Sequence, residues 1–139
     1  MHLKLFSWSL NKKTGLLGKP KPLTQNRKTG NWAEGLAAED LRKKKMRILA
    51  RNWTYKNDEL DIIAQDGEGV VFVEVRARSA KAHVPGYFTL GGGKRTALRR
   101  AINAYLHEHG EVPWRFDVVE VSYSSTKDYE VKHYEGVRL

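Results

Sequence analysis

The sequence contains no cysteine, and only four of its 139 residues are proline. The absence of cysteine excludes disulfide bonds and thiolate metal sites. No apolar run approaches the roughly 20 residues that span a bilayer, and Lys4 interrupts the apolar start. We therefore expect neither a transmembrane helix nor a secretory signal. With 40% hydrophobic residues the chain can form a real core, so we expect a single cytoplasmic domain.

Acidic residues are absent from the first 33 positions, which carry seven lysines and arginines. The chain has a formal net charge of +9, so most of the excess lies in this N-terminal segment. A basic arm can neutralise nucleic-acid phosphates, although a solvated leader has the same composition. We interpret residues 1–29 as a weakly ordered basic extension and residues 30–139 as the folded domain. Nucleic acid is the partner that this charge favours.

Residue periodicity predicts a helix, three strands, a second helix and one or two further strands. The first helix is expected to start at Asn31 as N-cap, with Glu34 placed as in a capping box. Strands are expected at residues 46–55, 59–78 (a hairpin), 115–123 and 128–136. Apolar residues at helical spacing predict the second helix from Lys94 to a C-terminal Gly110. This order predicts an α/β fold with a mixed sheet flanked by helices.

The hairpin segment ELDIIAQDGEGVVFVEVRAR has Gly67 and Glu68 where a two-residue type II′ turn would lie. In that register one face carries only apolar pairs and is expected in the core, while charged pairs lie on the other face. The apolar pairs are Ala64–Val71, Ile62–Val73 and Leu60–Val75, and the other face pairs Ile63–Phe72, Asp61–Glu74 and Glu59–Arg76.

Asp61 and Glu74 would then have Cβ atoms roughly 4.5–5.5 Å apart. Like charges at that distance destabilise a sheet unless a cation compensates. Mg²⁺ commonly binds one or two carboxylates, so this register predicts a magnesium site, with Mn²⁺ as a second candidate. A two-residue slip would instead place Asp61 opposite Arg76 as a plain salt bridge. Taken alone, the hairpin slightly favours the salt bridge.

Several sequence blocks occur together in an order and spacing that resembles the bacterial YraN-like proteins, over roughly residues 30–122. The blocks are NWAEGLAAEDL, ILARNW, ELDIIAQDG, VVFVEVRAR, the helix at Lys94, and RFDVVEV. These uncharacterised proteins are relatives of the archaeal Holliday-junction resolvases. The resemblance therefore implies a restriction-endonuclease-like fold and a metal-dependent endonuclease site for branched or structured DNA.

Matched to the family motif, the catalytic positions fall on Glu34, Asp61, Glu74 and Arg76, and the three acids would bind Mg²⁺. Glu59 matches a family acid beside the site, where it would support the ligands or pair with Arg76. Arg76 stands where the family's Glu-x-Lys motif has lysine. Arginine stays protonated, so it can orient a phosphate but is a poor general base. A nucleic-acid-binding protein of the same fold without catalysis is therefore the alternative.

Basic residues near these positions are candidates for contact with a nucleic-acid backbone. Arg78 follows the motif, and Lys94, Arg95 and Arg99 lie near the start of the second helix, where backbone N–H groups attract phosphate. A solvated basic face is the other interpretation of these residues. Because junction resolvases act as dimers, the resemblance also implies a homodimer. A protein-interaction module with ion-paired carboxylates is a third, weaker interpretation.

Overall fold

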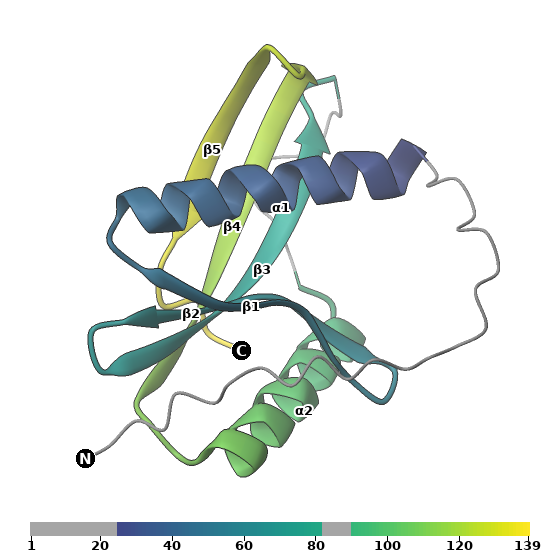
Figure 1. Ribbon diagram of the computed structural model, residues 1–139. Helices are drawn as coiled ribbons and strands as arrows, with labels where there is room; N and C mark the ends of the chain where they lie inside the picture. The colour runs from purple at the N-terminus through teal and green to yellow at the C-terminus, as the bar shows by residue number, and fades with distance from the viewer. Residues whose placement is uncertain (1–24, 82–89) are drawn as a thin grey trace, which may run out of the picture.

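Two helices and five strands form within the part of the chain that the computed structural model describes, residues 25–81 and 90–139. Their order, which is helix, three strands, helix, two strands, confirms the prediction (Figure 1). The elements are α1 (Gln25–Lys43), β1 (Arg47–Tyr55), β2 (Asp58–Asp66), β3 (Gly69–Ser79), α2 (Gly92–His109), β4 (Trp114–Ser125) and β5 (Asp128–Tyr134). Residues 1–24 of the expected basic extension lie outside the described residues. Neither helix combines the length and apolar character needed to cross a membrane.

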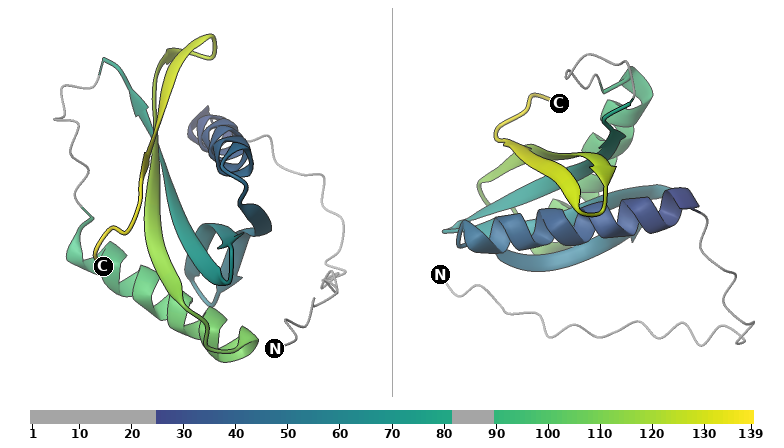
Figure 2. Two further views of the ribbon diagram at one scale, coloured as in Figure 1. Left: turned by 90° about the vertical axis from the view of Figure 1, so that its left-hand side faces the viewer. Right: turned by 90° about the horizontal axis from the view of Figure 1, so that it is seen from above.

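The five strands form one mixed sheet in the order β1-β2-β3-β4-β5. β3 and β4 are parallel, while the other neighbours are antiparallel. A parallel pair needs a crossover, and α2 provides it. The helices lie on opposite faces of the sheet, α1 on one and α2 on the other (Figure 2). The predicted α/β architecture is confirmed, and it is consistent with a restriction-endonuclease-like fold.

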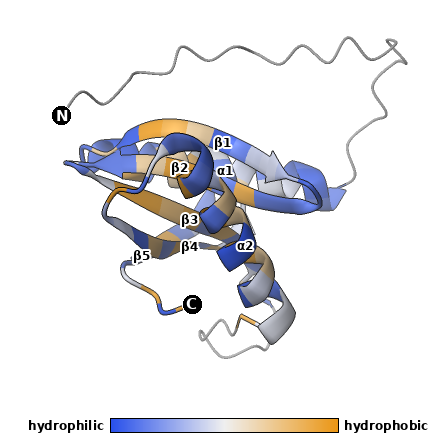
Figure 3. Cartoon of the chain, turned by 90° about the horizontal axis from the view of Figure 1, so that it is seen from below, coloured by the Kyte–Doolittle hydropathy of each residue, from blue (hydrophilic) through white to orange (hydrophobic). Residues whose placement is uncertain are grey.

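Both faces of the sheet are covered by a hydrophobic core. On the α1 side, Leu41 packs with Ile62 and Val73, and on the α2 side Phe72 packs with Leu98. Hydrophobic residues are concentrated in the central strands, and much of both helices is hydrophilic (Figure 3). The apolar hairpin face was expected in the core, and Ile63 and Phe72 of the other face are buried as well. A central strand with a helix on each side is buried on both faces.

The hairpin has the predicted register over its closed half. Ile62 pairs with Val73 and Ile63 with Phe72, and Gly67 has the positive φ of 59° that a type II′ turn requires. This register excludes the two-residue slip. The pairing of β2 with β3 covers only Ile62–Asp66, however, so the predicted ladder pairs of Asp61–Glu74, Leu60–Val75 and Glu59–Arg76 do not form.

The hairpin opens because the first half of β2 follows β1 rather than β3 (Figure 1). β1 has an irregularity between Ile48 and Ala50, and Asn52 adopts a positive φ of 50°. Such irregularities bend a strand and increase its twist. As a result Leu60 packs on the α2 side with Ile63, not on the α1 side with Ile62.

Helix α1 begins at Gln25, six residues before the predicted N-cap. Asn31 and Glu34 lie inside the helix, so the capping-box interpretation was wrong. The polar residues ahead of Asn31 include Gln25, Arg27 and Lys28, which have good helix propensity and extend the helix. At the other helix the prediction is confirmed. Gly110 ends α2 with a φ of 94°, and its N–H donates to the Leu106 carbonyl.

Candidate metal centre

Asp61 lies where β2 separates from β3. Backbone pairing between the two strands is absent at this point, and the Asp61 side chain bonds to β3 instead. Its Oδ2 accepts a hydrogen bond of 2.8 Å from the backbone N–H of Val75. This bond fixes the carboxylate beside the third strand. The opening of the hairpin therefore leaves Asp61 outside the β2–β3 ladder, while its carboxylate still satisfies one backbone donor, the N–H of Val75.

Three acids from two elements converge at this opening. Carboxylate oxygens of Glu34 on α1, and of Glu59 and Asp61 on β2, all lie within 4.8 Å of one another. Two oxygens bound to one Mg²⁺ at 2.0–2.1 Å are at most roughly 4 Å apart, so small side-chain movements would bring this set onto one ion. Glu59, expected beside the site, thus lies among its ligand atoms.

Glu74 adjoins these acids from β3. The residue is 6% exposed, and its Oε2 is buried without a hydrogen-bond partner among the described residues. Its Oε1 lies 3.1 Å from Nζ of Lys94 on α2. We call Glu34, Glu59, Asp61 and Glu74 the Asp61 cluster.

Burial, together with the charge of Glu74, raises the pKa of Asp61 to about 8. Burial also raises the pKa of Glu34, although a hydrogen bond from Asn52 and the charge of Arg51 act in the opposite direction. Arg51 Nη2 lies 3.7 Å from Glu34. These carboxyl groups resist simultaneous ionisation in the absence of a cation.

The donor set fits a hard divalent cation. It consists only of carboxylate oxygens, and two of them, Glu34 Oε2 and Glu74 Oε2, are buried without a hydrogen-bond partner among the described residues. Oxygen ligands of this kind suit Mg²⁺ or Mn²⁺. An orphaned buried oxygen is costly and calls for an explanation. A bound divalent ion would satisfy it and would return Asp61 to its ionised form.

The Asp61 cluster borders an open hollow of about 570 Å³ between the first half of α1 and the β1–β2 strands. Its lining is polar and consists of Asn26, Arg27, Gly30, Asn31, Glu34, Asn52, Thr54 and Glu59. Glu34 and Glu59 thus belong both to the cluster and to this hollow. A ligand can approach the acids from this side.

Sequence reasoning missed Asn52 and Arg51, which support Glu34. The available signal was an asparagine in a predicted strand, where this residue is disfavoured. It also missed Asp58, which is 9% exposed and accepts two hydrogen bonds, of 2.7 and 2.8 Å, from Arg100. The Arg100 guanidinium lowers the pKa of Asp58 and ties α2 to the start of β2.

The predicted basic residues lie in two environments. Arg76 and Arg78 follow Glu74 on alternate positions of β3 and therefore share its face, and Lys94 contacts Glu74 directly. Arg95 and Arg99, in contrast, donate to backbone carbonyls of the C-terminal segment.

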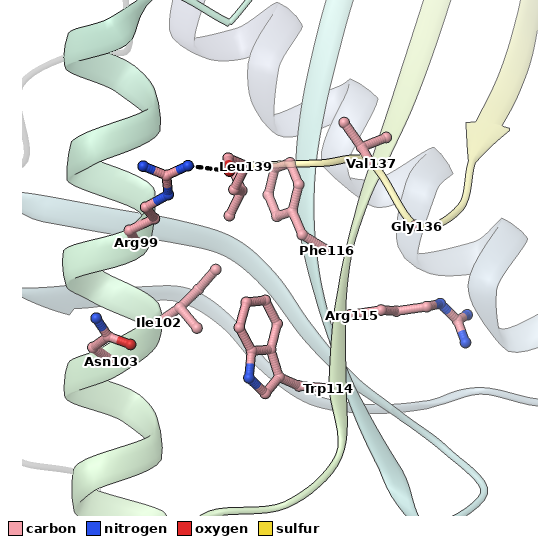
Figure 4. A pocket seen from close by; sticks show the side chains of 9 residues that line it. All are labelled: Arg99, Ile102, Asn103, Trp114, Arg115, Phe116, Gly136, Val137 and Leu139. Atoms are coloured by element: carbon pink, nitrogen blue, oxygen red, sulfur yellow. Dashed lines mark hydrogen bonds between the residues drawn. The ribbon is translucent and has the colours of Figure 1, made fainter.

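Arg95 Nη1 lies 3.2 Å from the Arg138 carbonyl, and Arg99 bonds the Leu139 carbonyl at the edge of a second hollow (Figure 4). This hollow of about 450 Å³ lies between α2, β4 and the C-terminal segment, and Trp114, 44% exposed, forms part of its wall. The described contacts therefore join Lys94, but neither Arg95 nor Arg99, to the acids.

A second group with metal-ligand spacing consists of Asp117, His133 and Glu135, which we call the Asp117 cluster. Asp117 is fully buried and accepts hydrogen bonds from His133 Nε2 (2.8 Å), Arg115 Nε (3.1 Å) and the Gly136 N–H (3.0 Å). Burial opposes its ionisation, but these donors hold the pKa of Asp117 below its usual value. Its charge is already satisfied by protein groups.

The comparison with known proteins decides the family. The model of the uncharacterised protein family UPF0102 matches residues 33–121. The chain belongs to this family. A UPF0102 protein of Carboxydothermus hydrogenoformans is 37% identical over 113 residues, which cover 80% of this chain and 95% of that protein. UPF0102 protein STH1475 of Symbiobacterium thermophilum is 40% identical over 98 residues, with 69% and 83% covered. These are the YraN-like proteins that the sequence blocks resemble, so the predicted family is confirmed.

The UPF0102 match spans every residue of the Asp61 cluster and Lys94, whereas His133 and Glu135 lie beyond it. Among solved structures, SfsA of Pyrococcus furiosus in complex with Ca²⁺ is similar over 76% of this chain and 64% of that chain, with a TM-score of 0.37 and 12% identity. A likeness of this size carries no argument about this chain.

Proposed function

We propose that this UPF0102 protein binds nucleic acid and is an Mg²⁺-dependent endonuclease, with Mn²⁺ as a possible substitute, that acts on branched or structured DNA. The observation that supports the proposal most is the buried Oε2 of Glu74, which has no donor among the described residues and adjoins Asp61, whose pKa is raised to about 8 by burial and by the charge of Glu74. Neighbouring buried carboxylates with oxygens that no donor satisfies are arranged for a cation rather than for stability.

In this proposal the chain's own residues have distinct roles. Asp61, Glu74 and Glu34 would hold the ion. Glu34, Asp61 and Glu59 lie at ligand spacing from one another, and Glu74 adjoins Asp61. A bound Mg²⁺ would activate a water and stabilise charge on a phosphodiester. Arg76 and Arg78 lie farther along the same face of β3, where their guanidinium groups would orient the phosphate.

Binding of the nucleic acid is proposed on the basis of charge and shape. The net charge of +9 favours a polyanion. The polar hollow beside Glu34, with Arg27 in its wall, offers hydrogen-bonding groups to a sugar–phosphate backbone rather than an apolar surface to bases. A homodimer is part of the proposal by analogy with the junction resolvases.

The test is incubation of the full chain with four-way-junction, single-stranded and duplex DNA in the presence of Mg²⁺ or Mn²⁺. The proposal expects cleavage that EDTA stops and that an Asp61→Ala/Glu74→Ala double variant lacks. Cleavage that persists in the double variant would contradict the site. Absence of salt-dependent binding to all three DNAs would contradict the proposal as a whole.

The alternative is a nucleic-acid-binding protein that does not cut. Arg76 favours it, because arginine cannot lose a proton to activate a water as a buried lysine can. Equal, salt-dependent binding of DNA by the native protein and the double variant, with no product in either, would support this alternative.

A further inference from the structure

Lys94 contacts the Asp61 cluster from an unexpected element. The family motif places a lysine two residues after the acid on β3, and this chain has Arg76 there. The structure instead directs a lysine from the first turn of α2 to the same acid, with Lys94 Nζ 3.1 Å from Glu74 Oε1. An ammonium group is therefore present beside the motif although the motif itself lacks one.

The environment of Arg76 separates its role from that of Lys94. In the parallel pairing of β3 with β4, Arg76 lies beside Glu120, which is itself 4% exposed. The same face of the sheet thus carries two buried acids, each next to a different cation. Lys94 is in direct contact with Glu74, one of the acids that are proposed to bind metal.

The two side chains of the Lys94–Glu74 pair differ in exposure. The Lys94 side chain is 43% exposed, whereas that of Glu74 is 8% exposed. A lysine has a flexible four-carbon stem, so its ammonium can leave the acid without any movement of the backbone. Glu74 cannot turn towards solvent in the same way, and its Oε2 still lacks a donor while Lys94 is bound.

We propose that Lys94 occupies the cation position at Glu74 in the metal-free protein, is displaced from that carboxylate by the divalent ion, and then presents its ammonium to the substrate phosphate. This inference rests on the proposed metal site. Lys94 is a positioning residue while it holds Glu74, and it supplies to the phosphate the lysine charge that the motif position lacks.

The proposal predicts that Lys94→Met changes metal binding and DNA binding in opposite directions. Because the ammonium and the ion compete for one carboxylate, loss of the ammonium should strengthen metal binding. Because the ammonium also serves the phosphate, the same loss should weaken the binding of DNA. A lysine that only stabilised the fold would, on removal, weaken both.

The first measurement is a calorimetric titration of the full-length protein with Mn²⁺ alone. We expect Lys94→Met to bind about tenfold more tightly than the native chain, because a nearby positive charge that opposes the ion is lost. Lys94→Arg keeps the charge and should stay near the native affinity. Lys43→Met is the matched control: it removes one charge from the exposed end of α1 and should change nothing.

The second measurement is the binding of a four-way junction in Ca²⁺ over a range of salt. Lys94→Met should lower the slope of log affinity against log salt by about one phosphate contact, and Lys43→Met should not. Unchanged or weaker Mn²⁺ binding by Lys94→Met would overturn the inference and leave the metal site standing. Failure of the native chain itself to bind Mn²⁺ would overturn the proposed function, and the inference with it.

Discussion

The two acidic clusters of this protein have similar composition and opposite electrostatics. Each brings three potential ligand residues within 4.8 Å. Asp117 is surrounded by donors from Arg115, His133 and Gly136, and its pKa is lowered. Asp61 has one backbone donor and faces other acids, and its pKa is raised to about 8.

The difference shows that the supply of donors, more than the number of acids, separates a structural carboxylate from a candidate ligand. Asp117 already receives its counter-charges from the protein, so an added cation would have to displace them. The Asp61 cluster leaves an oxygen of Glu74 without a donor, so a cation would relieve it.

The largest effect is expected from Asp117→Ala. The substitution removes the fully buried acceptor of His133 and the Gly136 N–H, whereas the partly exposed Arg115 keeps its contact with Asp66. Loss of one partner from a buried ionic network typically costs about 3–5 kcal/mol of unfolding free energy. Urea unfolding measures this. Asp61→Asn/Glu74→Gln, which removes facing charges, should be neutral or stabilising without metal. An equal loss in both proteins would erase the distinction between the clusters.

The second effect is stabilisation by metal. Mg²⁺ at tenfold its dissociation constant should raise the unfolding free energy by about 1.4 kcal/mol, because it binds only the folded chain. Thermal unfolding with and without Mg²⁺ tests this, and Asp61→Asn/Glu74→Gln should abolish the shift. His133→Gln, in the Asp117 cluster, should retain it. If the shift disappears in His133→Gln instead, the metal binds the Asp117 cluster, and its assignment to the Asp61 cluster is contradicted.

The third effect is a dependence of stability on pH. The folded chain keeps the Asp61 proton up to about pH 8, whereas the ordinary pKa is 3.8, so between these values the folded state binds more protons than the unfolded state. The stability that this proton contributes is complete below pH 4 and is lost as the pH rises through 8. Melting temperatures between pH 5 and 8.5, in EDTA, should fall less for Asp61→Asn than for the native chain. Saturating Mg²⁺ should remove the native slope, and identical slopes for both proteins would argue against a raised pKa.

The smallest effect concerns two glycines of α1 that serve as a matched pair. A Cβ at either Gly30 or Gly35 would meet nothing within 4 Å. Alanine at either position should therefore stabilise the helix by about 0.5–1 kcal/mol. Only Gly30 lines the hollow at Glu34, so Gly30→Gln should weaken DNA binding and Gly35→Gln should not. A gel-shift titration compares them, and equal affinities would remove the hollow from the proposed binding surface.

The closed half of the hairpin could be predicted because local rules determine it. Alternating apolar residues and the Gly67 turn fix one register, and a one-residue slip would mix the faces. The point at which the strands part could not be predicted in this way. It depends on the bend in β1 at Asn52 and on the Asp61–Val75 bond, which join residues that no single periodic pattern covers.

The acids of the candidate site could be predicted from the sequence, but the residues that contact these acids could not. Glu34 matched a capping box by spacing, but the helix continues N-terminal to it because the preceding residues also favour helix. Lys94 and Glu74 are 20 positions apart, and Asp117 and His133 are 16 apart, so each contact arises from the packing of the sheet and α2 or from strand pairing. Composition and periodicity carry no information on such contacts.

The most direct test of the central claim is the position of manganese in crystals of the native chain soaked in Mn²⁺, located by its anomalous scattering. The account predicts a peak between Asp61 and Glu74, within reach of Glu34, with Lys94 turned away from Glu74. A peak beside Asp117 and His133 with none at Asp61, or no protein-bound peak at saturating Mn²⁺, would contradict it.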